Sequence, residues 1–165
     1  MAKGDVTLYS DQAFGYPGDE VYAVASGSAA SINAGEPVAK ALGNSTGNVV
    51  SALATSKPVV GTDYLAGISA SVSTDTVSAA GTVYVTKLVD GISYLCAPKT
   101  AATWNTQALY DALVGSRVTF DLTGGVYTIN ATDGSTNGLV VMPLNITNYP
   151  GKVRFAIRAG ASYLA

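Results

Sequence analysis

The sequence predicts a mostly β domain, a small antiparallel barrel or sandwich with one short helix and an extended N-terminal arm. Strand-forming runs alternate with Gly, Pro, Asn and Asp turn signals over most of the 165 residues. One segment, around 105–114, instead has the apolar spacing of a helix. Residues 1–33 differ in composition from the rest, so we predict an arm at 1–33 and a β-rich domain at 34–165.

The arm is predicted from the high content of Gly, Ala and Ser in its sequence. Small, flexible residues disfavour a packed core. Phe14, Tyr16 and Tyr22 are spaced along the segment, and isolated aromatic side chains can fill pockets of a partner. We therefore predict these three side chains as anchors, with a simply frayed terminus as the alternative.

The first half of the domain is predicted to be extended chain. Pro37 suits the first residue of a strand, so "PVAKAL" is expected to enter one. A loop of turn formers at 43–48 and the apolar run "VVSALA" follow. Pro58 then indicates an edge position, while Gly61 and Gly67 indicate bends or bulges.

Two strands are predicted in the middle of the chain. "TVYVTKLV" alternates cleanly, with Val83 and Val85 facing the same side. Asp90-Gly91 is a strong hairpin signal, so this run and "ISYLCAP" are predicted to pair. The only cysteine, Cys96, has small or apolar neighbours and is expected to be a buried hydrophobe.

The predicted helix is "TWNTQALYDALVG". Thr103 or Asn105 can cap its first amides, and Gly115 is the expected end. The expected core-facing stripe is Ala108, Leu109, Ala112 and Leu113.

Four more strands are predicted to complete the chain: three follow the helix directly, and a final one ends the domain. Turns at 124–125 and 132–138 separate the first three. A Pro-Gly turn at 150–151 precedes the final strand. That strand alternates apolar residues with cations, in the order Lys152, Val153, Arg154, Phe155, Ala156, Ile157 and Arg158.

Composition restricts the classes of partner. Charged residues make up 12% of the chain, about half the usual share, which favours a protein that covers its surface against other proteins. The nine Lys and Arg residues are scattered, so no nucleic-acid partner is expected. The sequence shows no membrane-spanning run and no signal peptide, so we expect no membrane partner and synthesis in a cytoplasm.

No catalytic, cofactor-binding or metal-binding residues are assigned from the sequence. The chain has no histidine, which removes the usual general base and most zinc sites. "DGSTNG" at 133–138 matches half of a calcium loop, yet Leu144 stands where the loop needs a bidentate Glu. A hairpin turn explains the same residues, and we predict that the chain is not an enzyme.

Four blocks carry a resemblance to a known family: "INAGEPVAKALG", "VVSALATSKPVVGTDYLAGISA", "SAAGTVYVTKLVDGISYLCAPKTAATWNTQALYDALVGSRVTFDLTGGVYTI" and "DGSTNGLVVMPLNITNYPGKVRFAIRAGASYL". Over residues 32–165 the chain resembles the head decoration (cement) proteins of tailed bacteriophages. Particularly similar are the Ala-Gly-x-Pro-Val start, the Gly-x-x-x-Leu-Ala-Gly-Ile block and the terminal Arg-x-Gly-x-Ser-Tyr-Leu.

The resemblance implies a β-tulip-like module without cofactors, made in the bacterial host cytoplasm and carried on the outer surface of the phage head. Such proteins bind the major capsid protein of the expanded head, commonly as homotrimers, and stabilise contacts between its subunits. An extended arm commonly reaches onto the capsid. This chain is longer than the smallest members, particularly from the Trp104 helix onward.

Two alternatives stay open at this point. The first is another phage structural subunit, of the tail tube or a fibre. The second is a carbohydrate-binding surface module, for which Trp104, Tyr110 and Tyr127 are the aromatic candidates.

Overall fold

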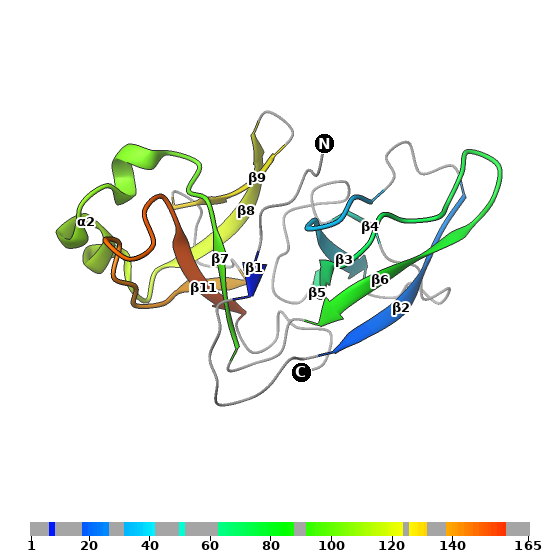
Figure 1. Cartoon of the computed structure of the whole chain (residues 1–165), viewed down its shortest axis with the longest axis horizontal. Helices are drawn as coiled ribbons and strands as arrows, with labels where there is room; N and C mark the ends of the chain where they lie inside the picture. The colour runs from blue at the N-terminus through cyan, green and yellow to red at the C-terminus, as the bar shows by residue number, and fades with distance from the viewer. Residues whose placement is uncertain are drawn as a thin grey trace.

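The computed structural model describes residues 7–8, 18–26, 32–41, 50–51, 63–87, 92–123, 126–131 and 138–157. These residues form two antiparallel sheets, with a short helix beside the larger one (Figure 1). The predicted mostly β class with one short helix is confirmed. The sheets are not closed into a barrel, and their arrangement is compatible with the sandwich alternative.

The six-stranded sheet contains most of the second half of the chain. Its order is β1 (Thr7–Leu8), β7 (Ser93–Cys96), β11 (Val153–Ile157), β10 (Leu139–Val141), β8 (Arg117–Thr123) and β9 (Val126–Asn130). The segment after β7 curls round to the far edge. There the N–H of Lys99 donates to the C=O of Ile129 at 2.8 Å, and the N–H of Ile129 donates to the C=O of Ala97 at 2.9 Å. The outer edge of β9 is therefore partly covered.

The five-stranded sheet has the order β2 (Asp19–Val24), β6 (Gly81–Lys87), β5 (Asp63–Ser69), β3 (Pro37–Ala41) and β4 (Val50–Ser51). The predicted pairing of β6 with β7 is wrong, because these strands lie in different sheets. β6 pairs with β2 on one side and with β5 on the other, so neither of its edges is available to β7.

Strand β2 also corrects the boundary of the predicted arm. Residues 19–24 pair with β6 over six positions, so this part of 1–33 belongs to a sheet. The local reason is the alternation of Tyr22 and Val24, both buried, with Val21 and Ala23, both exposed. Phe14 and Tyr16 lie outside the described residues.

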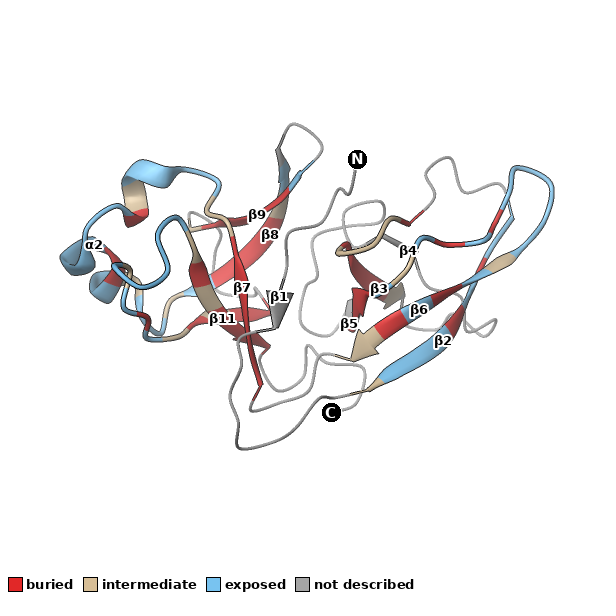
Figure 2. Ribbon diagram, in the orientation of Figure 1, coloured by how far each residue is buried: buried red, intermediate tan, exposed pale blue. Residues whose placement is uncertain are grey.

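The core consists of two clusters of buried residues. Figure 2 colours the buried residues red along the strands. In the larger, Phe155 packs edge-on against Phe120, with ring centroids 5.4 Å apart, and lies 5.9 Å from the ring of Tyr94. This cluster extends to Leu65 and Ile68, so it joins the two sheets. The smaller cluster packs beneath β2 and β6 and comprises Tyr22, Val24, Ile32, Val38, Ala66, Val83 and Val85.

Gly67 forms the predicted bulge. Val38 is opposite Gly67 and Ala39 is opposite Leu65, so β5 carries one extra residue at this point. A Cβ on Gly67 would lie 2.2 Å from the carbonyl oxygen of Thr86. Only glycine allows the two strands to approach this closely.

The helix differs from its predicted form. Helix α2 (Gln107–Leu113) follows a 3₁₀ turn, η1 (Ala101–Trp104), and its cap is Thr106, whose hydroxyl accepts the N–H of Leu109 at 3.3 Å. The predicted stripe is wrong: Ala108, Leu109 and Ala112 are exposed, Leu113 is half-buried, and Tyr110 is fully buried. Gly115 ends the helix as predicted, with φ +84°.

The hydroxyl of Tyr110 explains this change of face. It accepts the N–H of Arg154 at 2.9 Å and donates to the C=O of Met142 at 3.0 Å. Trp104 packs on the same ring, with centroids 5.6 Å apart. One tyrosine therefore fixes a two-turn helix to β11 and to the end of β10.

Several other predictions are confirmed. Cys96 is fully buried, Pro37 begins β3, and Val83 and Val85 share the buried face of β6. Val153, Phe155 and Ile157 are all buried in the final strand. Arg154, one of the cations predicted in that strand, is hydrogen-bonded within the protein. Its guanidinium donates to the Ser93 hydroxyl at 2.8 Å and to the Pro143 C=O at 3.2 Å. Outside the described residues lie the turns predicted at 43–48, 90–91 and 124–125, all but Gly138 of the turn predicted at 132–138, and Pro58, Gly61 and Arg158.

Gly67→Ala is expected to lower the free energy of unfolding by about 1–3 kcal/mol, because the added methyl group overlaps the backbone of β6. Denaturant unfolding measures the change. Thr82→Ala, at an exposed position of β6, is the matched control and should change stability by less than about 0.5 kcal/mol. Equal stability of the two variants would contradict the close approach.

Burial raises the pKa of the Tyr110 hydroxyl above its ordinary value of 10.0. The folded state therefore holds this proton more tightly than the unfolded chain, and the resulting stability is complete below pH 10 and falls as pH rises through the folded-state pKa. Tyr110→Phe should lower the free energy of unfolding by about 1–3 kcal/mol at neutral pH, because the Arg154 N–H loses its acceptor. The variant should also lose less of its stability than the wild type when the pH rises above 10. Tyr84→Phe, at an exposed ring, is the control, and identical pH profiles for both variants and the wild type would overturn this assignment.

Candidate interaction surface

The outer face of β2 and β6 presents an apolar pair. Val21 and Tyr84 lie directly opposite each other in the ladder, and each is 53% exposed. Ala23 and Thr82 form the next pair on this face, and Asp19 faces Thr86, whose hydroxyl donates to Asp19 Oδ1 at 2.6 Å. The face is thus mostly neutral, and its carboxylate already has a hydrogen-bond donor.

The connection between β5 and β6, residues 70–80, forms a projecting finger (Figure 1). Backbone bonds order it along its length: the N–H of Ala70 donates to Tyr84 C=O at 2.7 Å, and that of Thr74 to Thr82 C=O at 2.9 Å. At the tip, the Thr76 N–H donates to Ala79 C=O at 2.9 Å, and the Thr76 hydroxyl accepts the Ala79 N–H at 3.0 Å. The finger is therefore held in one shape by its own hydrogen bonds.

The surface of the finger is uncharged and carries two exposed valines. Val77 at the tip is 86% exposed and Val72 is 56% exposed. The one charged residue between 70 and 80 is Asp75, which is only 8% exposed. A rigid, neutral projection with an apolar tip is suited to contact with another protein and lacks the positive charge that phosphate groups require.

A buried polar clamp holds the base of the finger. The Ser73 hydroxyl accepts the N–H of Ile32 at 2.9 Å and donates to Asp75 Oδ1 at 2.5 Å, and the Ser73 N–H donates to Ile32 C=O at 2.8 Å. All three residues are buried. Because each of these polar groups has a partner, the clamp is a structural feature.

A second buried group lies where residues 33–36 meet the end of β5. The Ser69 hydroxyl accepts the N–H of Glu36 at 2.9 Å and donates to the C=O of Asn33. The Asn33 amide donates to Glu36 Oε1 at 2.7 Å. Glu36 therefore serves to fasten a loop, and nowhere in the described ranges do three or more acidic or thiol side chains gather as metal ligands would.

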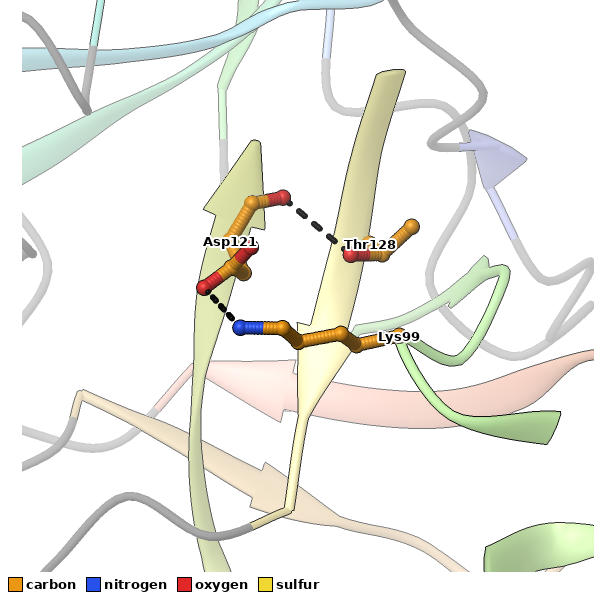
Figure 3. Close-up of polar contacts among 3 residues, drawn as sticks. All are labelled: Lys99, Asp121 and Thr128. Atoms are coloured by element: carbon orange, nitrogen blue, oxygen red, sulfur yellow. Dashed lines mark hydrogen bonds and ion pairs between the residues drawn. The ribbon is translucent and has the colours of Figure 1, made fainter. Parts of the chain in front are cut away.

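Lys99, in the segment after β7, forms a third polar group with Asp121 of β8 and Thr128 of β9 (Figure 3). Lys99 Nζ lies 2.8 Å from Asp121 Oδ2, and the Thr128 hydroxyl donates to the Asp121 C=O at 3.2 Å. The pair is partly open to solvent, so it contributes about 0–1 kcal/mol. The pair fixes the segment after β7 to β8, and the Asp121 carboxylate is already bound by Lys99.

An open hollow of about 440 Å³ lies beside helix α2, lined by Gln107, Asp111, Pro143, Leu144 and Asn145. The Gln107 amide nitrogen donates to Asp111 Oδ1 at 2.7 Å and to the Leu144 C=O at 2.9 Å. The Gln107 carbonyl accepts the N–H of Ile146 at 3.1 Å. The amide that lines the hollow is thus occupied by the protein itself, and these five residues offer no nucleophile with a base beside it.

Of the three predicted anchors, the described residues include Tyr22, while Phe14 and Tyr16 lie outside them. Tyr22 is 9% exposed, and its hydroxyl donates to Glu20 Oε2 at 2.8 Å, so its ring serves this chain's own core. Trp104, Tyr110 and Tyr127 are all buried, so they do not form the exposed row that sugar binding needs. The exposed valines were missed because isolated Val residues in a Ser/Thr-rich stretch have no sequence signal of their own.

Comparison with known proteins identifies no relative: no family model, no curated protein and no solved structure matches the chain. Among the described residues, no helix combines the length and the hydropathy needed to cross a bilayer.

Ser73→Ala is expected to destabilise the protein by about 1–3 kcal/mol, because the Ile32 N–H and the Asp75 carboxylate both lose a buried partner. Hydrogen exchange of the amides at 70–80 should rise more than that of the six-stranded sheet, since the clamp holds the finger. Ser78→Ala, on the exposed tip, is the matched control. Unchanged exchange of the finger in Ser73→Ala would show that the clamp does not order it.

Proposed function

We propose that the chain is a virion structural protein, a head decoration (cement) protein that binds the outside of the expanded phage head and stabilises contacts between major capsid protein subunits. The observation that carries the proposal is the ordered, neutral finger with Val77 at its tip. The identity of the particle comes from the resemblance of residues 32–165 to such proteins.

The finger suits a permanent contact for two physical reasons. Its hydrogen bonds already fix the bound shape, so little conformational entropy is lost on association. Its exposed surface carries no charge that would have to be stripped of water, and burial of apolar Val77 and Val72 is favourable.

Repetition strengthens such a contact. A homotrimer would present three fingers to one shell, so modest single contacts would multiply through a high effective concentration. The expected partners are therefore the major capsid protein and further copies of this chain. Phe14 and Tyr16 remain predicted anchors, and in the chain they fall in the connection between β1 (Thr7–Leu8) and β2 (Asp19–Val24).

A second candidate is a tail-tube or fibre subunit. The observation that favours it is that β2, among the described strands, has a neighbour on one side only, and an unpaired strand edge can pair with another subunit. Polymerisation of the purified protein into tubes or fibres, in the absence of heads, would support this candidate over the first.

Binding to expanded heads tests the proposal. The wild-type protein should co-sediment with heads stripped of decoration, and Val77→Asp should weaken binding by at least about tenfold, because a carboxylate would enter the contact. Leu109→Asp places the same charge on an exposed apolar position of helix α2 and is the matched control. Failure of the wild type to bind would overturn the proposed function, and equal binding of Val77→Asp would remove the finger from it.

A double substitution tests the predicted anchors in the same assay. Removal of residues 1–33 would delete β1 and β2 and damage both sheets, so the informative variant is Phe14→Ala with Tyr16→Ala, which keeps both strands. Weaker binding of this variant would support an anchoring role for the segment that contains Phe14 and Tyr16. Undiminished binding would remove these two side chains from the mechanism.

A further inference from the structure

The four edges of the two sheets are not equivalent. β1 and β4 have two residues each, and β9 is met by the segment that follows β7. β2 has six residues and, among the described strands, a neighbour on one side only. Long open edges are ready to pair with another chain, and proteins usually block them with charge, proline or a bulge.

The outer edge of β2 lacks these blocks over Val21–Val24. Its charges, Asp19 and Glu20, are confined to the first two positions. The N–H of Lys87 donates to the C=O of Gly18, so Gly18 forms a hydrogen-bonded pair with β6. Such pairs recur at every second residue of an antiparallel ladder, so the backbone groups of residues 20, 22 and 24 also bond to β6. The backbone groups of Val21 and Ala23 therefore point away from β6.

We propose that β2 pairs antiparallel with β2 of a second copy of this chain, across a two-fold axis at Val21. The two five-stranded sheets become one continuous sheet. A two-fold interface is self-complementary, so each copy offers the same edge as donor and acceptor. The pairing goes beyond the proposed function and does not depend on a phage head.

Charge and side-chain packing select this register. Pairing centred on Glu20 would place two carboxylates directly opposite each other, which is unfavourable. Centring on Val21 places Asp19 across from Ala23 of the second copy, so the acidic ends lie apart. On the outer face, Val21 then meets its own counterpart, which extends the Tyr84–Val21 pair into one apolar row across the axis.

A ladder of this length buries little surface, so we expect an association that depends on concentration. The two Val21 Cα atoms should lie about 5.5 Å apart, within the range that a disulfide spans. In the same register, the two Ala23 Cα atoms are offset along the strands by roughly 14 Å. Cys96 is fully buried and should not interfere.

Disulfide trapping of the full-length protein tests the pairing. In glutathione disulfide, Val21→Cys should form a covalent dimer at least about tenfold faster than Ala23→Cys or Val77→Cys, because only the first places two thiols together. Val77→Cys is the stringent control, since Val77 is more exposed than Val21. Equal rates for the three variants, or no dimer of Val21→Cys, would overturn the proposal.

A double variant separates pairing from exposure. Val21→Cys with Ala23→Pro removes an outward N–H and should abolish the fast crosslinking, while the bonds to β6 remain. Reaction of one thiol per chain with a thiol reagent shows that the introduced thiol is exposed and that Cys96 stays shielded in a folded core. Fast crosslinking that survives in this folded variant would also overturn the pairing, whether or not the protein binds heads.

Discussion

Both edges of β6 are occupied, and the arrangement of the chain follows from that constraint. β2 takes one edge over six residues and β5 takes the other. β7 is therefore excluded and joins β11 in the second sheet. The same pairing makes β2 an outer strand and makes the β5–β6 connection the projecting finger. The two exposed surfaces that we propose for protein contacts both adjoin this strand: the finger leads into the start of β6, and β2 pairs along one of its edges.

Hydrogen bonds of buried hydroxyl groups fix three segments of this protein to its two sheets. The Tyr110 hydroxyl fixes helix α2, the Ser73 hydroxyl fixes the finger, and the Ser69 hydroxyl fixes the loop at 33–36. Each bond is modest, yet each is buried, so loss of one partner leaves a costly unpaired group. In the described part of a chain with 12% charged residues, these bonds fasten the segments while the surface of the finger stays uncharged and suited to contact with other proteins.

Local structure could be predicted from the sequence much better than pairing. The alternation of Val83 and Val85 and the Gly67 bulge were correct, because side-chain period and glycine sterics act over a few residues. Asp90-Gly91 indicates that the chain reverses direction but not which strand the next strand pairs with, so the predicted β6–β7 hairpin was wrong. The helix face was wrong because the buried Tyr110 hydroxyl outweighs the stripe of small apolar residues. The boundary at 33 failed because composition hid the short alternating run at 19–24, and the apolar tip at Val77 had no pattern to indicate it.

The central claim is our proposal that this protein works by contact with neighbouring subunits of a phage shell. An electron cryo-microscopy map of mature heads of a phage that encodes this chain tests the proposal most directly. We expect density for the chain at regular positions on the outer surface, with residues 76–79 against the major capsid protein. Mature heads without the chain, or copies bound with the 76–79 tip facing solvent, would contradict the claim.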